Sequence, residues 1–409
     1  MRRCGLLGQT LKHSYSPAIH RALGVGYSYE LFEVEPENLA VFMSNTDWDG
    51  LNVTIPYKQA VIPYCASLSP DAIAIGSVNT IVRSSDGDLY GDNTDAVGFL
   101  AMLRQSGIAV TGKKVLVLGS GGSSLTVRHV LKNQHAGEII IISRHGEETY
   151  ETIDRHKDAQ IIVNTTPVGM YPSTGMSPIE LDRFPMLEGV LDIIYNPART
   201  RLLIDAETRG IPNIGGLSML VGQAAEAAAM FCGVVMDGQR EQKIIHMLQE
   251  QMENIILIGM PGSGKSVIGQ LLAKQLNRPF VDIDNEIEKT AGRTIPEIFE
   301  QDGEEYFRKM ETQAIERWGK ESGLVIATGG GAVTREENYC HMHQNGRIVF
   351  IKRDVSKLER SDRPLSQGDM QAMYEQRFPL YKRFADYTVQ NERELQDVVD
   401  QLVKEWSQP

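Results

Sequence analysis

One glycine-rich segment constrains the fold of this chain more than any other feature. Gly259-Met-Pro-Gly-Ser-Gly-Lys-Ser266 fits the pattern G-x-x-x-x-G-K-[ST] in full, directly after the apolar run Ile255–Ile258 and before the helical stretch Val267–Gln275. Glycines in such a turn let backbone N–H groups point at phosphate oxygens, and the following helix directs its positive end at the same anion. In this pattern the lysine contacts the β- and γ-phosphates, and the serine hydroxyl coordinates magnesium. The segment therefore predicts a nucleotide-binding P-loop between a buried strand and a helix.

Short apolar runs bounded by glycine or polar turns recur along the chain and alternate with longer amphipathic stretches. This alternation is typical of parallel strands joined by crossover helices, so we expect an α/β fold. The runs are Val115–Leu118, Ile139–Ile142, Ile161–Val163, Val190–Ile194, Ile255–Ile258, Val325–Ala327 and Ile348–Ile351.

The length of 409 residues exceeds what one hydrophobic core usually holds, so we expect two domains. The charged segment Gln239–Glu253 places Ile244, Leu248 and Met252 on one helical face, which is typical of a domain's last helix. We therefore divide the chain into domains 1–252 and 253–409. Within the first, we expect a substrate lobe from residues 1–100 and about 215–252, and a cofactor lobe from about 101–214, which opens with the glycine-rich turn after Leu118.

Composition and charge exclude several classes of function. The formal net charge of −12 argues against nucleic acid as a partner. The sequence has neither a signal peptide nor an apolar stretch of about 18 residues, so we expect a soluble protein without membrane contact. Oligomeric state cannot be predicted from these residues. Four cysteines form neither a disulfide nor a metal-binding pattern and are typical of a cytoplasmic protein: Cys4, Cys65, Cys232 and Cys340.

Further polar clusters in the second domain could hold a phosphoryl acceptor. Phe280-Val-Asp282-Ile-Asp284 ends an apolar run with two carboxylates that would share one face of a strand. One can organise Mg²⁺, and the other can accept a hydrogen bond from the acceptor hydroxyl. A lone arginine is most often part of a surface ion pair, but three together could clamp a carboxylate and the transferring phosphoryl group. These arginines are Arg308, Arg363 and Arg377.

With the bare turn Thr328–Gly331, these motifs resemble shikimate kinase from about Asn254 to the C-terminus. The resemblance implies an adenylate-kinase-like P-loop domain that uses ATP and Mg²⁺. It assigns Mg²⁺ to Ser266 and Asp282, and catalysis to Asp284, Lys265 and the lid residue Arg363, although Val355–Arg363 is short for the family's lid. The residues implied for shikimate are Asp284, Arg308, Gly330, Gly331 and Arg377. Those implied for ATP are Gly259, Gly262, Ser263, Gly264, Lys265, Ser266 and Arg363.

A second glycine-rich turn, Gly119-Ser-Gly-Gly-Ser-Ser124, follows the run Val115–Leu118 and precedes a helical stretch. A dinucleotide pyrophosphate could lie at the start of that helix. Plain strand-to-helix turns also have this form, but the next apolar run leads into Ser143-Arg-His145, where NAD-binding folds carry an acidic residue. Arginine there favours the 2′-phosphate of NADP. Only 16 residues separate Arg144 from Ile161, so we expect part of a helix and strand to be missing.

Hydroxyl and amide side chains gather in turns of the first hundred residues, as a polyhydroxylated ligand requires. With Asn164-Thr-Thr-Pro167 and Leu217–Gln223, these turns resemble shikimate dehydrogenase over about residues 3–250. The resemblance makes Lys58 and Asp95 the catalytic pair, because an alkoxide that forms during hydride transfer needs a proton donor. It also implies a Rossmann-like NADP(H) lobe. The residues implied for substrate are Ser14, Ser16, Asn52, Thr54, Lys58, Asn79, Asp95, Tyr195 and Gln223, and those for NADP are Gly119, Gly121, Gly122, Ser123, Ser143, Arg144, Asn164 and Thr165.

The two resemblances support each other, because the product implied for the first domain is the substrate implied for the second. We therefore expect a bifunctional enzyme that reduces 3-dehydroshikimate with NADPH and then phosphorylates shikimate with MgATP. Two alternatives for the first domain stay open. It could act on quinate, or it could be an NADP-binding module without turnover.

Overall fold

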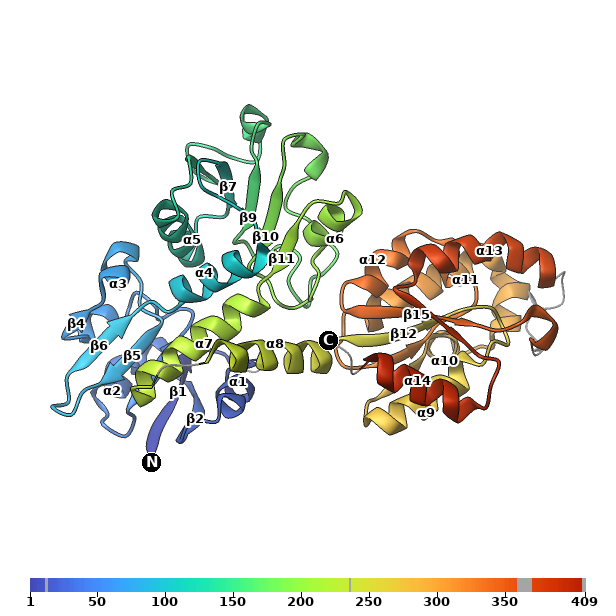
Figure 1. The fold of residues 1–409 in the computed structure, drawn as a ribbon, viewed down its shortest axis with the longest axis horizontal. Coiled ribbons are helices and arrows are strands. Elements are labelled where there is room, and N and C mark those ends of the chain that lie inside the picture. Colours follow the sequence, from blue (N-terminus) through green and yellow to red (C-terminus); the bar gives the residue numbers. More distant parts are fainter. Residues whose placement is uncertain (12–13, 235–236, 359–369, 407–409) are drawn as a thin grey trace. The chain divides into compact units, whose positions relative to one another are not determined.

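The computed structural model describes residues 1–11, 14–234, 237–358 and 370–406. The chain forms two compact units, coloured along the sequence in Figure 1. Unit 1 consists of Met1–Val168, Ser177–Tyr195 and Asp205–Met247, and unit 2 of Gly169–Met176, Asn196–Ile204 and Leu248–Pro409. Strands that are mainly parallel alternate with helices in both units, which confirms the predicted α/β fold class.

The first sheet of unit 1 has the strand order β2-β1-β3-β5-β6-β4 and is mixed, because β5 runs antiparallel to both of its neighbours. Its core lies around the buried side chains of Trp48, Leu51 and Tyr57. The strands are β1 (Arg2–Gly8), β2 (Tyr27–Glu33), β3 (Gly50–Val53), β4 (Ser67–Leu68), β5 (Thr80–Arg83) and β6 (Leu89–Asp92), and the helices beside them are α1 (Ser16–Leu23), α2 (Leu39–Ser44) and α3 (Pro70–Ile75).

The second sheet of unit 1 is parallel throughout, in the order β11-β10-β9-β7-β8. Strand β7 lies between β9 and β8 and leads into α5 at its carboxyl end, which is where α/β sheets bind ligands. The strands are β7 (Lys114–Leu118), β8 (Glu138–Ile142), β9 (Ile161–Asn164), β10 (Gly189–Asp192) and β11 (Asn213–Gly215). The helices in this part of the chain are α4 (Asp95–Ser106), α5 (Gly122–Asn133), α6 (Arg201–Thr208), α7 (Leu217–Cys232) and α8 (Gly238–Met252), of which α6 and α8 each include residues assigned to unit 2.

The connection from β8 to β9 is as short as the sequence implied. It lies wholly within the described residues and contains one turn of 3₁₀-helix, Ile153–His156, and no α-helix. A single bridge between Ser143 and Thr149 closes the loop after β8. The shortened segment therefore crosses the sheet without the usual covering helix.

Helices α4 and α7 pack closely because glycines face each other across them. A Cβ at Gly98 would collide with the carbonyl of Met219, and a Cβ at Gly222 would lie 3.3 Å from the Cα of Gly98. This close approach carries Gln223 of α7 to the sheet residues near the start of α4.

Unit 2 has a parallel sheet in the order β13-β14-β12-β15-β16, with β12 at its centre. Helices cover both faces (Figure 1): α9 and α14 pack on one, and α10 to α13 pack on the other. The strands are β12 (Asn254–Ile258), β13 (Phe280–Asp282), β14 (Val325–Ala327), β15 (Gly346–Lys352) and β16 (Tyr387–Gln390), and the helices are α9 (Lys265–Leu276), α10 (Ile283–Ala291), α11 (Ile295–Gly319), α12 (Glu337–His343), α13 (Met370–Phe384) and α14 (Leu395–Trp406).

Unit 2 also holds one short segment from each of two connections earlier in the chain, Gly169–Met176 and Asn196–Ile204. The fully buried amide of Asn345 joins the second of these to the rest of the unit. Its oxygen accepts from the backbone N–H of Ala198 at 2.8 Å, and its nitrogen donates to the carbonyl of Lys320 at 2.9 Å. Unit 2 is therefore not built from one continuous stretch of sequence.

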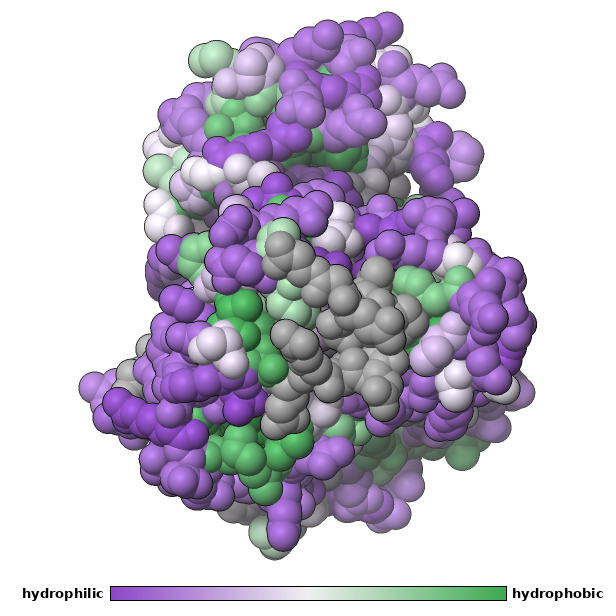
Figure 2. Space-filling model, turned by 90° about the vertical axis from the view of Figure 1, so that its right-hand side faces the viewer, coloured by the Kyte–Doolittle hydropathy of each residue, from purple (hydrophilic) through white to green (hydrophobic). Residues whose placement is uncertain are grey.

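The surface agrees with the charged composition of the chain. The face drawn in Figure 2 is mostly hydrophilic, and its apolar side chains lie in separate groups. Among the described residues, no helix combines the length and the apolar character needed to cross a membrane.

Candidate active sites

The P-loop, Gly259–Ser266, lies between β12 and α9 as predicted. Gly259 and Gly264 have φ values of +148° and +92°, which favour glycine, and a Cβ at Gly259 would lie 2.5 Å from the carbonyl oxygen of Ile351. The Lys265 ammonium donates to the carbonyls of Gly259 and Met260, each at 2.9 Å, and so lies across the mouth of the loop. The Ser263 hydroxyl is buried without a hydrogen-bond partner among the described residues. A glycine-rich turn with a lysine ammonium held against it, at the start of a helix, fits a polyphosphate.

A hydroxyl and a carboxylate meet beside the P-loop. Ser266, in the first turn of α9, donates to Asp282 Oδ2 at 2.6 Å, and Asp282 is the last residue of the neighbouring strand β13. Oxygen ligands of this kind, shared with phosphate, are what Mg²⁺ prefers in nucleotide sites. The two residues therefore fit the magnesium position expected from the sequence.

One sequence prediction is wrong. Asp282 and Asp284 do not share a strand face, because β13 ends at Asp282 and Asp284 lies in the first turn of α10. The Asp282 carboxylate caps this helix by accepting from the N–H of Asp284 at 3.0 Å and of Asn285 at 3.4 Å. The cap ends the strand two residues earlier than the alternation of side chains implied. Asp284 is nevertheless buried, and its carboxylate lies beside Gly329.

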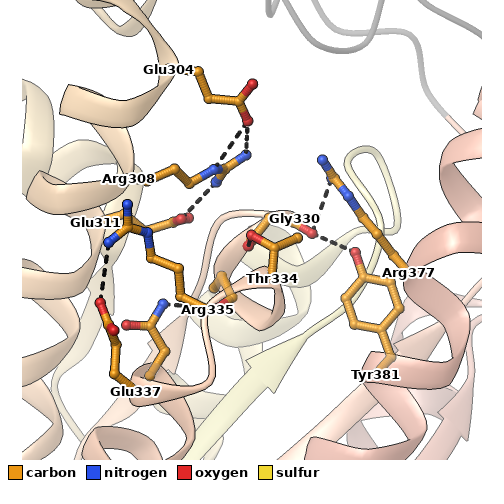
Figure 3. Close-up of polar contacts among 12 residues, drawn as sticks. Glu304, Arg308, Glu311, Gly330, Thr334, Arg335, Glu337, Arg377 and Tyr381 are labelled. Atoms are coloured by element: carbon orange, nitrogen blue, oxygen red, sulfur yellow. Dashed lines mark hydrogen bonds and ion pairs between the residues drawn. The ribbon is translucent and has the colours of Figure 1, made fainter.

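Figure 3 shows the arginine cluster of unit 2 around the turn Thr328–Gly331, here called the acceptor loop. Arg308 of α11 is buried and donates from Nη1 to Glu311 at 2.6 Å and from Nη2 to Glu304 at 3.1 Å. A Cβ at Gly331 would collide with the Arg308 guanidinium, so only glycine lets this loop lie against the arginine. The arrangement places a fixed cation next to backbone that carries no side chains, as carboxylate recognition requires.

Helix α13 contributes two further residues to the cluster. Arg377 Nη1 and the Tyr381 hydroxyl both donate to the carbonyl oxygen of Gly330, at 3.2 and 2.5 Å, and both side chains are buried. On its other side Gly330 abuts the P-loop, since a Cβ there would lie 2.5 Å from Pro261 Cδ. The structure thus brings Arg308, Gly330, Gly331 and Arg377 together.

Glu311 belongs to this cluster, although sequence reasoning missed it. Its carboxylate is fully buried, and burial is the main reason that its pKa lies above the ordinary value; nearby Asp284 raises it further, while Arg308 lowers it. One carboxylate oxygen has no hydrogen-bond partner in the described part of the chain. The three-residue spacing from Arg308, which puts both on one helical face, is the signal that could have revealed it. The lid residue Arg363 lies outside the described residues.

In unit 1, Lys58 and Asp95 form a close ion pair. The Lys58 ammonium lies 2.6 Å from Asp95 Oδ2, and the carboxylate side chain is only 7% exposed. Lys58 comes from the turns after β3, and Asp95 is the first residue of α4, where the helix N-terminus favours a negative charge. The two residues are 37 positions apart in the sequence, so the fold brings them together.

A chain of hydrogen bonds connects the amides expected to bind substrate. Asn79 Nδ2 donates to Gln223 at 3.2 Å, and Asn79 Oδ1 accepts from the N–H of Thr94 at 2.7 Å. Thr80 links Asn79 to Asn52, whose Nδ2 donates to the Thr80 hydroxyl at 3.2 Å. These contacts fix which way each amide points, which a specific site for hydroxyl groups needs.

Tyr29 extends this chain and was also missed from the sequence. Its hydroxyl donates to Asn52 Oδ1 at 2.8 Å. Burial raises the pKa of Tyr29, and the nearby side chain of Ser16 lowers it in part. Its ring stacks on buried His20, with ring centroids 3.8 Å apart. Ser14 lies beside Ser16, whose N–H it accepts at 3.2 Å. Tyr29 is partly exposed. Its phenol lies close to two predicted substrate residues, Asn52 and Ser16.

Two other predicted substrate residues lie at the borders of this lobe. Thr54 directly follows β3, is partly exposed, and donates its N–H to the carbonyl of Leu7 at 2.9 Å. Tyr195 packs edge to face on Tyr15, with ring centroids 5.9 Å apart. Burial raises the pKa of Tyr195, so its phenol stays a neutral hydrogen-bond donor.

The second glycine-rich turn lies at the carboxyl end of β7. Gly119 has φ +104°, and a Cβ there would lie 2.8 Å from the hydroxyl of Thr165, which itself donates to Leu118 O at 2.6 Å. Added side chains at Gly121 and Gly122 would meet no atom of the described chain within 4 Å. No side chain of the described residues caps the start of α5, where Ser123 occupies the first turn. This bare helix start fits a dinucleotide pyrophosphate.

The residues expected around the NADP ribose lie nearby on neighbouring strands. Buried Ser143 follows β8 and donates to the carbonyl of His145 at 2.5 Å, while Arg144 is exposed. Arg144 also lies near Tyr150, whose pKa it lowers against the larger, raising effect of burial. Asn164, at the end of β9, is buried and donates to Asp192 at 3.0 Å. An exposed arginine at this strand end fits a 2′-phosphate.

The two parts of the chain each match a known protein family. Residues 6–81 match the family model of the shikimate dehydrogenase substrate binding domain, and residues 261–407 match that of shikimate kinase. The shikimate dehydrogenase (NADP(+)) of Clostridium beijerinckii is 36% identical over 61% of this chain and 98% of its own length. That of Methanopyrus kandleri is 39% identical over 56% of this chain and 89% of its own length.

Solved structures agree over the same part of the chain. A chorismate mutase/shikimate 5-dehydrogenase fusion protein from Clostridium acetobutylicum is 34% identical, with a TM-score of 0.59, over 61% of this chain and 97% of its own. Shikimate 5-dehydrogenase from Thermus thermophilus, solved with NADP(H) and shikimate, is 31% identical with a TM-score of 0.55, over 60% of this chain and 99% of its own. Together with the family models, these matches confirm both resemblances seen in the sequence.

Proposed function

The chain belongs to the shikimate dehydrogenase family and carries a shikimate kinase domain behind it, and on this premise we propose that it catalyses two successive reactions. Unit 1 reduces 3-dehydroshikimate to shikimate with NADPH. Unit 2 then phosphorylates the 3-hydroxyl of shikimate with MgATP. The observation that carries this proposal is that one chain combines two families in which the product of the first is the substrate of the second.

In the reduction, Lys58 and Asp95 act as a proton-transfer pair. Bound NADPH supplies the hydride equivalent. The Lys58 ammonium donates a proton to the carbonyl oxygen of the substrate as negative charge develops on it, and the Asp95 carboxylate at 2.6 Å holds the ammonium in position. Asn79, Gln223 and Asn52 orient the ring hydroxyls through their fixed amides.

In the phosphorylation, the chain positions two anions and stabilises the charge that develops between them. Bound MgATP supplies the phosphoryl group. Lys265 and the P-loop N–H groups hold its phosphates, while Ser266 and Asp282 are the protein groups for Mg²⁺. We assign Asp284 to the acceptor hydroxyl and the guanidinium groups of Arg308 and Arg377 to the carboxylate of shikimate.

We further propose that NADPH is preferred to NADH because Arg144 stands where the 2′-phosphate would lie. We also propose a cytoplasmic location, which the four cysteines without a disulfide pattern support.

Two variants of the full chain test the division of labour. Lys58→Ala should lose NADPH oxidation with 3-dehydroshikimate by at least about a hundredfold and retain ADP release with shikimate. Lys265→Ala should show the reverse. Each retained activity reports that the variant has folded. Retention of reduction by Lys58→Ala would refute the assignment of the catalytic pair, and quinate assayed in parallel would reveal a different preferred substrate.

A further inference from the structure

We propose that Tyr381 is a positioning residue for phosphoryl transfer, because its hydroxyl joins the acceptor loop to the P-loop. This inference rests on the kinase function proposed above and deepens it. Tyr381 touches neither phosphate nor acceptor in our assignment; it acts through Gly330 and Met260.

Packing against the sheet fixes the position of the Tyr381 side chain. It is fully buried in α13, and its ring stacks on Phe350 of β15, with centroids 4.9 Å apart and planes inclined by 15°. Figure 3 shows the side chain projecting from α13 toward Gly330. Since both ring torsions are fixed by packing, the hydroxyl has a defined position in the sheet-side core.

That hydroxyl lies between the two loops that would carry the reactants. It donates to the carbonyl oxygen of Gly330 at 2.5 Å and lies 3.7 Å from Met260 Sδ in the P-loop. Gly330 also lies directly against Pro261 of the P-loop, so the loops meet at one point and the phenol bridges them at an adjacent one. The phenol therefore closes a junction between the nucleotide loop and the acceptor loop.

The orientation of one peptide group transmits this contact to the site. A trans peptide is planar, so fixing the Gly330 carbonyl also fixes the N–H of Gly331 on the opposite side. Gly331 lies against the Arg308 guanidinium, which we assign to the substrate carboxylate. The Tyr381 hydroxyl and Arg377 Nη1 share the Gly330 oxygen, so removal of the hydroxyl leaves the peptide held by one donor, at the longer distance of 3.2 Å, and lets it tilt.

Phosphoryl transfer is sensitive to such a tilt, because the acceptor oxygen must lie in line with the transferring group. A displacement of about 1 Å can cost about a hundredfold in rate. If Tyr381 only packs, its aromatic ring is sufficient; if it positions the Gly330 peptide, its hydroxyl is required. Tyr381→Phe keeps the ring and removes the hydroxyl, so it separates the two roles.

The test uses the full chain with Tyr381→Phe and, as a matched control, Tyr387→Phe, whose buried hydroxyl has no hydrogen-bond partner in the described part of the chain. We expect Tyr381→Phe to lower the kinase kcat about five- to twentyfold and to raise KM for shikimate, while KM for ATP stays within about twofold. Tyr387→Phe should match the native chain. NADPH oxidation by each variant reports its concentration and folding, and MgATP binding reports that unit 2 is intact.

A native kcat and native KM for shikimate in Tyr381→Phe would overturn the inference, as would equal losses in the two variants. Loss of MgATP binding in Tyr381→Phe would also overturn it, because the hydroxyl would then support the fold instead of the alignment. A native chain that binds MgATP but releases no ADP with shikimate would refute the kinase function itself. That result appears before either variant is compared, so the two failures are distinguishable.

Discussion

Glu311 holds Arg308 in the kinase unit through a buried ion pair within one helix. The Arg308 Nη1 nitrogen lies 2.6 Å from Glu311 Oε2, and the side chains are 7% and 1% exposed. Removal of one partner from a buried pair leaves an uncompensated charge and frees the other to move. The same arginine abuts the acceptor loop at Gly331, so its orientation is part of the site.

Replacement of Glu311 by glutamine should therefore impair the kinase more than the fold. We expect kcat/KM for shikimate to fall at least about tenfold, because the neutral amide no longer fixes the guanidinium. The control is Glu304→Gln, since Glu304 contacts the same arginine from a half-exposed position. Steady-state ADP release with each variant decides the matter, and equal effects of the two substitutions would contradict the special role of the buried carboxylate.

Tyr29→Phe should weaken reduction while leaving phosphorylation unchanged. The substitution removes the hydroxyl that contacts Asn52 and Ser16 and keeps the ring that stacks on His20. We expect KM for 3-dehydroshikimate to rise about three- to tenfold, as for the loss of one hydrogen bond in a site. Tyr64→Phe, at an exposed 3₁₀ turn, should be neutral. An unchanged KM in Tyr29→Phe would show that the tyrosine does not orient these residues.

Acid should destabilise unit 1 through His20. Burial lowers the pKa of His20 to about 3 from 6.5, and the Tyr27 hydroxyl lies 2.5 Å from its Nδ1. Below pH 6.5 the unfolded chain binds a proton that the folded chain refuses, so the free energy of unfolding falls as pH drops from 6.5 toward 3, by up to about 1.4 kcal/mol per pH unit. Above pH 6.5 His20 is neutral in both the folded and the unfolded chain, so this destabilisation is absent there.

The heat inactivation of NADPH oxidation, measured at pH 7 and pH 5, tests this. The native chain should lose thermal stability between the two, and His20→Gln should lose less because glutamine does not titrate. His135→Asn is the control, since His135 is exposed and asparagine tolerates its positive φ of 57°. The same pH sensitivity in His20→Gln as in the native chain would refute this source of acid instability.

Arg144→Ala should reduce discrimination between the two nicotinamide cofactors. The side chain is exposed at the end of β8 and is our candidate for the 2′-phosphate. We expect KM for NADPH to rise about tenfold or more, with little change for NADH, because only NADPH carries the phosphate. Arg183→Ala serves as the control, because Arg183 forms an ion pair with Asp154 away from the end of β8 in the sequence. A proportional loss with both cofactors would show that Arg144 does not read the 2′-phosphate.

Local patterns in the sequence were enough to place the P-loop and the buried strands. Val115–Leu118 and Ile255–Ile258 each extend by one residue at the start, as β7 and β12, because an apolar run flanked by glycine leaves little freedom. The position of Asp284 was misjudged because the capping bond of Asp282 competes with strand alternation, and a pattern of period two does not represent a cap.

The residues missed from the sequence share one property: their importance depends on contacts between distant segments. Tyr381 meets Gly330 across 51 positions, and Tyr29 meets Asn52 across 23. In the sequence, a tyrosine in an amphipathic helix or an edge strand cannot be distinguished from a residue that only packs, because the hydrogen-bond partner of its hydroxyl is not known. Only Glu311 had a local signal, the helical spacing from Arg308.

The most direct test of the bifunctional account supplies the native chain with 3-dehydroshikimate, NADPH and MgATP and follows NADPH oxidation and ADP release together. We predict that ADP release lags behind NADPH oxidation and that the amount of ADP released equals the amount of NADPH oxidised at completion. Omission of NADPH should abolish ADP release. ADP release without NADPH, or complete NADPH oxidation without any ADP, would contradict the claim that one chain performs both reactions in sequence.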